Sequence, residues 1–187
     1  NNVMARQLFL TLGAAGGNGT AGNESPRPAT LASARAATAQ LVQEATRGLS
    51  GGMGGHASRA GAGPSACEGE ALQLDNGSGL SRNERSSALC LGQWLQAMWR
   101  SPVMPEFVAS LPVNGTDGTT RRWQAAAGRA HIKTGSLDGV AAMAGYVEGA
   151  EGGSRVIVVG LVNHPRADAG RPVLQALIDW AQHLNAP

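Results

Sequence analysis

The sequence predicts an α+β fold in which an antiparallel sheet is flanked by helices. Along its 187 residues the chain has helical patterns first, then three consecutive strand patterns, and then a closing helix. Only the short Gly-rich segment 148–154 separates the last two strands, which is typical of an antiparallel hairpin. A doubly wound parallel sheet would alternate strands with helices, so this order argues against one.

Apolar residues at helical spacing predict two helices in the first quarter of the chain, over 3–12 and 28–48. The first ends at Gly13, a residue type favoured just beyond a helix C-terminus. The second has Pro28 at its start. We expect this helix to bury one face, made of Leu31, Ala34, Ala37, Leu41, Val42 and Ala45.

Three more helices are expected further along the chain. Ser81 with Glu84 three residues later forms a capping-box pattern, which predicts the start of a helix that stops before Pro102. A short helix is expected over 105–110. The closing helix, 172–184, is predicted to turn these residues inward: Val173, Leu177, Leu184 and either Trp180 or Ala181.

A short strand is expected over 71–75, followed much later by the three main strands over 131–136, 141–148 and 155–163. The apolar run Val156 to Val162 has no polar alternation, so we expect this strand to be covered on both faces. Seven residues are far too few to span a bilayer.

Composition excludes several classes of protein. Apolar residues make up 42% of the chain, which argues against disorder, and a net charge of +2 argues against an electrostatic nucleic-acid binder. No transmembrane segment is expected. A chain of this length forms one domain, in which the Gly-rich stretch 48–70 is interpreted as an inserted loop.

Cysteine and histidine usage gives no sign of a metal site, and no cofactor is expected. The four histidines are scattered, and Cys67 and Cys90 match no metal-ligand spacing. The two cysteines permit at most one disulfide, and the sequence leaves their pairing open. Cys90 lies in an apolar helical pattern, which favours a buried small hydrophobic residue.

Lys133 is the single lysine among fifteen basic residues. It is either a chance survivor of a lysine-poor composition or a residue that arginine does not replace. A compact ammonium approaches a reacting centre more closely than a guanidinium and changes its pKa more readily. The count alone leaves both interpretations open.

Lys133, Thr134 and Gly135 form a K-T-G triplet on the predicted strand 131–136. This triplet belongs to the motif set S-x-x-K, S-D-N, K-T-G of serine acyl-transfer enzymes. The ammonium attracts a substrate carboxylate, the threonine hydroxyl hydrogen-bonds it, and the glycine lets a substrate backbone lie close to the strand. An extended peptide is expected to pair with this strand.

The chain resembles the C-terminal part of the penicillin-binding D-alanyl-D-alanine carboxypeptidase/endopeptidase family, of low-molecular-mass, periplasmic type. The resemblance implies a penicillin-binding/serine β-lactamase-like transpeptidase fold, of which the chain is the C-terminal portion, and a periplasmic location. It is carried by these blocks: NNVMARQLFLTLG (1–13), DNGSGLSR (75–82), LPVNGTDGT (111–119), HIKTGSLDGVAAMAGYVEG (131–149) and VIVVGLVNH (156–164).

The resemblance implies roles for individual residues. Lys133 supplies electrostatic attraction, and Thr134 and Gly135 bind substrate. Ser136 is implied to give its backbone N–H to the oxyanion hole and its carbonyl to the substrate amide. Asn2 matches the last residue of the family's S-x-N motif, which orients the lysine of the nucleophile motif and the substrate; it also suits a helix N-cap, and the two roles are compatible.

Other polar residues of the matching blocks are assigned to turns. Asp75 and Ser78 are interpreted as structural turn residues, and Asp138 as part of a strand connection. Asp117 either touches substrate or forms a turn through its side chain.

The nucleophile motif S-x-x-K is not among the 187 residues: three positions before the single lysine, Lys133, stands Ala130 rather than serine. We therefore expect a serine-type carboxypeptidase/endopeptidase that cleaves peptidoglycan stem peptides ending in D-Ala-D-Ala through an acyl-enzyme and is inhibited by β-lactams. The present chain is expected to be inactive alone. The alternatives are a serine β-lactamase and a non-catalytic peptidoglycan-binding pseudoenzyme.

Overall fold

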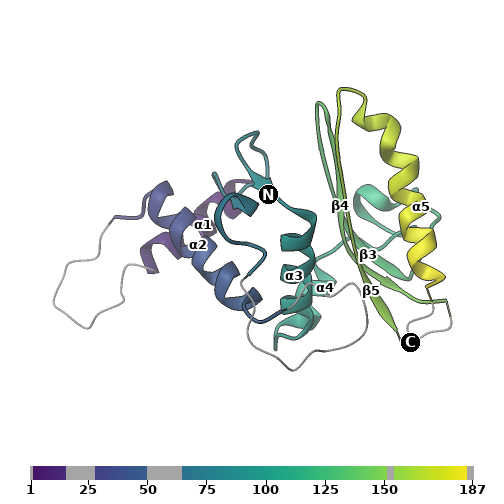
Figure 1. Cartoon of the computed structure of the whole chain (residues 1–187), viewed down its shortest axis with the longest axis horizontal. Coiled ribbons are helices and arrows are strands. Elements are labelled where there is room, and N and C mark those ends of the chain that lie inside the picture. The colour runs from purple at the N-terminus through teal and green to yellow at the C-terminus, as the bar shows by residue number, and fades with distance from the viewer. Residues whose placement is uncertain (1, 16–27, 50–64, 151–153, 185–187) are drawn as a thin grey trace. The chain divides into compact units, whose positions relative to one another are not determined.

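A computed structural model describes residues 2–15, 28–49, 65–150 and 154–184, and these form two compact units (Figure 1). Unit 1 comprises Asn1–Gly51 and Ser58–Trp94, and unit 2 comprises Gly52–Ala57 and Leu95–Pro187. Helices and antiparallel strands confirm the predicted α+β class. That the whole chain is part of a single penicillin-binding domain stays a prediction.

In unit 1, α1 (Asn2–Ala15) packs against α2 (Leu31–Thr46). The side chain of Thr30 caps α2 by accepting the N–H of Ser33 at 3.0 Å. Gly13 does not end the first helix as predicted but lies buried within it. A Cβ atom at Gly13 would stand 2.5 Å from the backbone nitrogen of Ala34, so the glycine allows the two helices to approach closely.

The predicted buried face of α2 is correct at Ala34 and wrong at Leu31, Leu41 and Ala45, which are exposed. Ala34 is fully buried, whereas Leu31 and Leu41 are 40% and 46% exposed. Because α1 meets α2 through Gly13, the residue at the contact is small and the large side chains lie outside it.

The second half of unit 1 is tied together by a disulfide between Cys67 and Cys90, whose Cα atoms are 4.7 Å apart. Cys90 is buried, as predicted, but it is not a free hydrophobic residue. Around the disulfide lie these short elements: η1 (Gly69–Ala71), β1 (Leu72–Gln73) and β2 (Arg85–Ser86), with β1 paired antiparallel to β2.

The predicted capping box is wrong. Ser81 donates its hydroxyl to Asp75 at 2.6 Å instead of capping a helix. Helix α3 (Ala88–Trp99) begins later in the chain, where Ser87 accepts the N–H of Cys90 at 3.0 Å. A Ser-x-x-Glu pattern is defined by only two residues, so it also occurs where no helix begins. Here the serine binds the Asp75 carboxylate instead.

Residues 50–64 of the predicted Gly-rich loop lie outside the described residues. The end of that stretch, from Ser65, is ordered by contacts: Ser65 is buried and its hydroxyl lies 2.5 Å from that of Thr46. The N–H of Ala66 donates to the side chain of Gln93 at 2.8 Å.

Unit 2 is built on a three-stranded antiparallel sheet in the order β3 (Ala130–Leu137), β4 (Val140–Glu148), β5 (Arg155–Asn163). These bounds match the three predicted main strands to within one residue at each end. Asp138 and Gly139 connect β3 to β4, and the second connection is closed by a 3.0 Å bond from the N–H of Gly149 to the carbonyl of Ser154. The predicted hairpin is confirmed.

Helices cover both faces of the sheet (Figure 1). On one face α5 (Arg171–Gln182) packs over a cluster that includes Ile132, Met143 and Val158. On the other face the end of α3 and α4 (Met104–Ala109) pack over Tyr146 with Ile157 and Val159. Strand β5 therefore contributes to both clusters, as its unbroken apolar run predicted.

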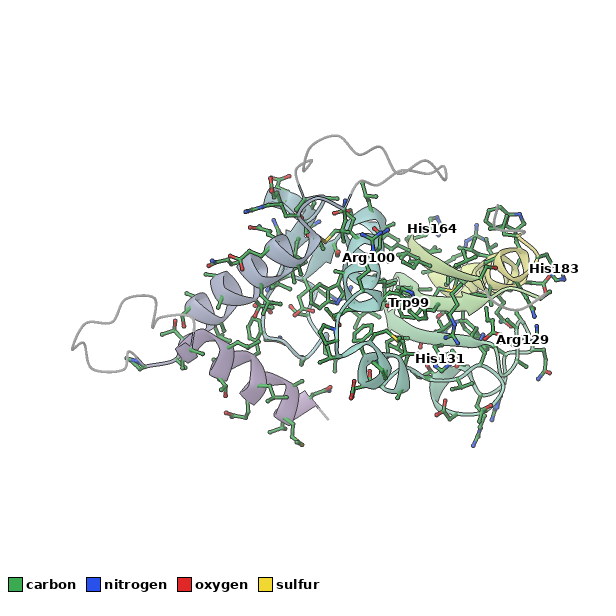
Figure 2. All side chains as sticks on the ribbon, turned by 90° about the horizontal axis from the view of Figure 1, so that it is seen from below. Trp99, Arg100, Arg129, His131, His164 and His183 are labelled. Atoms are coloured by element: carbon green, nitrogen blue, oxygen red, sulfur yellow. A yellow bond between two sulfur atoms is a disulfide. The ribbon has the colours of Figure 1, made fainter. Side chains whose placement is uncertain are left out.

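Trp99 of α3 packs against Tyr146 on this second face, with ring centroids 5.2 Å apart. Trp99 is labelled in Figure 2. The buried hydroxyl of Tyr146 donates to the carbonyl of Leu95 at 2.7 Å. Burial raises the pKa of Tyr146 to about 12. This polar bond fixes the end of α3 on the sheet.

The inward face predicted for α5 is correct at Leu177, which packs against the core, and at Ala181 as the alternative to Trp180, but it is wrong at Val173. Leu174, Ile178 and Ala181 are buried, whereas Val173 and Trp180 are 67% and 58% exposed. Val173 and Leu174 each begin a set of apolar residues at helical spacing, so the spacing alone does not show which of the two is buried. Contact with the sheet does: a Cβ added to Gly160 of β5 would stand 2.6 Å from Leu174, so Leu174 occupies the space above that glycine.

Candidate active site

Strand β3 is an edge of the sheet, and its outer side is only partly paired. The N–H of Ile132 donates outward to the carbonyl of Pro112 at 2.8 Å. Because successive residues of a strand direct their backbone groups to opposite sides, Thr134 and Ser136 also face outward. Among the described residues no strand pairs with the outer edge beyond Ile132. Within the described part of unit 2, the last part of β3 therefore presents an unpaired edge.

Lys133 lies on the sheet face that carries α3 and α4, since its cross-strand partner Ala144 packs in that cluster. Its side chain is exposed, and Nζ donates to the carbonyl of Thr134 at 2.7 Å. No ion pair joins Lys133 to a carboxylate of the described residues. The ammonium thus lies at the strand edge. Among the described residues, the outward-facing carbonyl of Thr134 is its only hydrogen-bond partner.

Thr134 and Ser136 lie on the opposite sheet face, where Met143 is the cross-strand partner of Thr134. The Thr134 hydroxyl is hydrogen-bonded to the hydroxyl of Thr119, which belongs to η2 (Gly118–Thr120). The Ser136 hydroxyl accepts a hydrogen bond from Nη2 of Arg171 at 2.8 Å. Hydroxyls from β3 and η2 and one guanidinium from α5 therefore gather beside the edge.

Arg171 is the first residue of α5, and it is held by Asp168 of η3 (Ala167–Gly170). Nε and Nη2 of the guanidinium donate to the same carboxylate oxygen of Asp168 at 3.0 and 2.9 Å. Asp168 thus binds Arg171, and Arg171 in turn binds Ser136.

Gly135 lies between the two outward-facing residues. A Cβ atom added there would lie 3.6 Å from the Cβ of Ala142, an ordinary van der Waals contact. The packing of this chain therefore has room for a side chain at position 135. A requirement for glycine at this position has to come from something outside the chain that approaches the strand.

The structure brings together four of the five predicted site residues, because Lys133, Thr134, Gly135 and Ser136 are consecutive on β3. Asn2, the fifth, is an exposed residue in the first turn of α1 and belongs to unit 1. Its assignment to the same site stays a prediction.

Sequence reasoning missed the polar neighbours of the triplet: Thr119, Asp168 and Arg171. Thr119 ends the LPVNGTDGT block that was singled out, so its position held a signal. Asp168 and Arg171 lie outside every block, in the segment just before the predicted closing helix. Their contact with β3 depends on how α5 packs on the sheet.

The residues assigned to turns have structural contacts. Asp117 accepts the N–H of Val113 at 2.6 Å, and Ser78 binds the side chain of Asn76. Asp75 accepts hydrogen bonds from Ser81 and Arg35. The Ser81 hydroxyl, and after it Arg35, hold the pKa of Asp75 below its ordinary value of 3.8.

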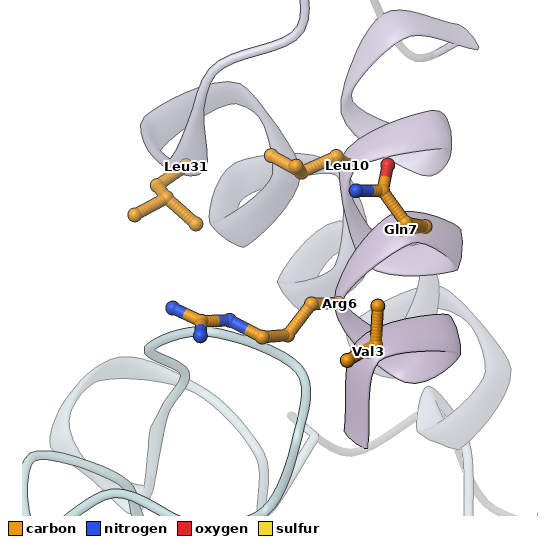
Figure 3. Close-up of a pocket in the computed structure, with 5 residues that line it drawn as sticks. All are labelled: Val3, Arg6, Gln7, Leu10 and Leu31. Carbon is orange, nitrogen blue, oxygen red and sulfur yellow. The ribbon is translucent and has the colours of Figure 1, made fainter. Parts of the chain in front are cut away.

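Unit 1 contains a separate hollow between α1 and α2, of about 350 Å³, lined by Val3, Arg6, Gln7, Leu10 and Leu31 (Figure 3). Its lining has one charged side chain and no nucleophile. Over the described ranges, the structure has no cluster of three or more His, Cys, Asp or Glu residues suited to a metal ion. Within the same ranges no helix is both long and apolar enough to cross a bilayer.

Two solved structures of a penicillin-binding protein share the fold of this chain. A structure of penicillin binding protein 4 from Haemophilus influenzae complexed with a β-lactam matches 96% of this chain and 37% of its own, with a TM-score of 0.63 and 22% identity. A second structure of that protein matches 81% of this chain, with a TM-score of 0.55. The fold is therefore the penicillin-binding fold, as predicted.

The sequence places the chain within a family of this fold. Residues 65–184 match the D-Ala-D-Ala carboxypeptidase 3 (S13) family, and the chain belongs to that family. This result confirms the resemblance recognised from the sequence.

Two curated relatives agree. Carboxypeptidase DacB of Mycolicibacterium smegmatis is 35% identical over 114 residues, which cover 56% of this chain and 24% of that protein. A D-alanyl-D-alanine carboxypeptidase of an Actinomadura species is 38% identical over 89 residues, which cover 43% of this chain and 16% of that protein. The chain thus spans a quarter or less of the curated relatives it matches.

Proposed function

We propose that this chain supplies the K-T-G strand of a serine-type D-Ala-D-Ala carboxypeptidase/endopeptidase that acts on peptidoglycan stem peptides. The observation that carries the proposal is the unpaired end of β3, where an exposed ammonium and two hydroxyls lie beside outward-facing backbone groups. Family membership supports the same activity.

In the proposed reaction a serine oxygen attacks the carbonyl carbon of the penultimate D-Ala, and the peptide bond to the terminal D-Ala breaks. The departing amine takes up a proton, and water then hydrolyses the ester that remains on the serine. The serine belongs to an S-x-x-K motif, which these 187 residues do not contain. β-Lactams acylate the same serine because they imitate the dipeptide.

The residues of β3 are assigned to binding and charge stabilisation. Lys133 attracts the terminal carboxylate, and Thr134 hydrogen-bonds it. The backbone N–H of Ser136 stabilises the oxyanion, and its carbonyl accepts the substrate amide. Gly135 leaves room for the substrate backbone, and Asn2 orients the lysine of the nucleophile motif. The peptide adds as an extended strand along the outer edge of β3.

We also propose a periplasmic location for the protein. The Cys67–Cys90 disulfide supports it, because disulfides persist in oxidising compartments.

Labelling with fluorescent penicillin tests the proposal. We expect covalent labelling of a full-length protein that carries this chain and the S-x-x-K serine, and no labelling of the 187-residue chain. Labelling of the short chain would contradict the assignment of the nucleophile, and an unlabelled full-length protein would favour the pseudoenzyme. Rapid turnover of nitrocefin would identify a β-lactamase instead.

A further inference from the structure

We infer that Arg171 is a positioning residue for recognition of the substrate carboxylate, and that it acts through the hydroxyl of Ser136. This inference rests on the proposed function. It assigns a role to a side chain outside the K-T-G strand. Arg171 lies in none of the sequence blocks that carry the family resemblance.

The hydrogen bond between Arg171 and Ser136 has a fixed direction. A guanidinium has only donors, so the contact between Arg171 and Ser136 makes the serine oxygen an acceptor. The serine proton is then not used in that bond and remains available to another acceptor. Because Ser136 belongs to the end of β3 that no described strand pairs with, a carboxylate lying along this edge is the acceptor within reach.

The guanidinium of Arg171 is anchored by Asp168. Asp168 accepts both Nε and Nη2, so the planar group is held in one orientation while Nη2 also reaches Ser136. This pair is exposed, with 45% of the Arg171 side chain accessible, and it contributes little to stability. The main effect of the Asp168–Arg171 pair is therefore to hold Arg171 in position to bind the Ser136 hydroxyl.

Arg171 is the first residue of its helix. A cation in the first turn of a helix faces the positive end of the helix dipole, and α5 has no acidic residue in that turn. Placement of an arginine there is locally unfavourable. Such a departure from local preference is expected where a residue serves a site.

The neighbouring hydroxyl pair extends the pattern. Thr134 lies on the same strand face as Ser136, and its hydroxyl is bonded to that of Thr119. When Thr119 donates in this pair, Thr134 also keeps its proton for a ligand. Two hydroxyl donors, each fixed by a neighbour from another element, then lie two residues apart along the edge, with Lys133 supplying charge.

The test measures second-order acylation rates in the full-length protein with benzylpenicillin and with its methyl ester, which lacks the anionic carboxylate. For Arg171→Gln we expect about a tenfold loss with benzylpenicillin, the size of one charge-assisted hydrogen bond. With the ester we expect less than about a twofold change, because the carboxylate is absent. Arg171→Lys retains a cationic donor and is expected to recover part of the loss.

A double-mutant cycle with Ser136→Ala tests whether Arg171 acts through the serine. We expect the double variant to lose no more than Ser136→Ala alone, because removal of the hydroxyl removes the group that Arg171 positions. Arg155→Gln is the matched control: Arg155 also pairs with a carboxylate, Glu148, but at the opposite end of the sheet.

Equal losses with the acid and the ester, full activity of Arg171→Gln, or additive effects in the cycle would each overturn the inference. Thermal unfolding of each variant separates misfolding from these outcomes, and Asp168→Asn, which releases the guanidinium without removing it, provides a second variant with a smaller loss in the same direction. If the unmodified full-length protein is not acylated at all, the proposed function fails instead.

Discussion

At the scale of single residues, the location and partner of a polar group indicate its role better than the residue type alone. The ammonium of Lys133 is exposed at the strand edge and bound to the carbonyl of Thr134. Had it been buried against a distant carboxylate, it would have served packing and not substrate binding. The retained lysine therefore has a position that suits the role expected from the sequence.

Replacement of Lys133 by alanine in the full-length protein is expected to slow acylation by fluorescent penicillin at least about 100-fold. Positioned electrostatic groups of this kind contribute roughly 2.7–4 kcal/mol to transition-state stabilisation. Gel-based labelling rates measure the effect. A loss smaller than about threefold, far below that range, would contradict the assigned role.

Gly135→Ala is expected to separate folding from activity. The added methyl group meets only Ala142 at ordinary contact distance, so the melting temperature is expected to remain unchanged. Acylation is expected to fall about 10- to 100-fold, because displacement of the substrate backbone misaligns the reacting atoms. Unimpaired acylation would show that no substrate backbone lies against this strand.

Asp75 gives a pH dependence. Since the Ser81 hydroxyl and Arg35 lower its pKa in the folded state, ionised Asp75 stabilises the fold above its ordinary pKa of 3.8. That stabilisation is lost as the pH falls through the lowered value. Denaturant unfolding between pH 7 and pH 3 is expected to show a smaller acid loss in Asp75→Asn than in the parent chain.

The control for this experiment is Asp179→Asn, which removes an exposed carboxylate on α5. Its unfolding curve is expected to keep the acid loss of the parent chain. An unchanged acid loss in Asp75→Asn would contradict the assigned contribution of Asp75.

At the scale of elements, the β3–β4 pairing depends on one backbone position. Gly145, opposite Ile132, has φ 158°, and a Cβ atom there would stand 2.0 Å from the carbonyl oxygen of His131. An alanine cannot be accommodated unless the two strands separate. The register that places the K-T-G triplet at the edge therefore requires glycine at this point.

Gly145→Ala is expected to reduce the free energy of unfolding by about 2 kcal/mol or more, through backbone strain and lost pairing. Gly92→Ala is the matched control, since a Cβ atom there meets nothing within 4 Å and the position is helical. That control is expected to be neutral or stabilising by up to about 1 kcal/mol. Equal destabilisation by both changes, measured by urea unfolding, would contradict the steric explanation.

At the scale of the whole molecule, a disulfide stabilises unit 1, and hydrophobic clusters on both faces of the sheet stabilise unit 2. The Cys67–Cys90 disulfide joins the segment before η1 to α3. In unit 2, by contrast, helices cover both faces of the sheet without a covalent link among the described residues. The two units thus use different means to remain folded.

Reduction of the disulfide is expected to lower the stability of the chain by about 3 kcal/mol, from the restored freedom of a loop of this length. Urea unfolding with and without dithiothreitol measures the change. The double variant Cys67→Ser, Cys90→Ser is expected to unfold at the same point under both conditions. Identical midpoints for the parent chain with and without reductant would show that the disulfide contributes no stability.

The sequence by itself determined the three main strands and the K-T-G triplet on which the candidate site is built. Long apolar runs and short Gly-containing connections have few alternative structures, so 131–136, 141–148 and 155–163 were predicted to within a residue. The K-T-G triplet was found for the same reason, since its residues are adjacent in the chain. Local patterns of this kind need no knowledge of distant contacts.

Only the tertiary structure decided that Leu174 and Ile178 complete the buried face of α5, and which partners the triplet has. Leu174 rather than Val173 faces inward because Gly160 leaves space beneath it. That packing brings Arg171 to Ser136 across 35 residues of sequence, and the fold of η2 brings Thr119 to Thr134. Such contacts depend on how separate elements pack, and no spacing within either element encodes them.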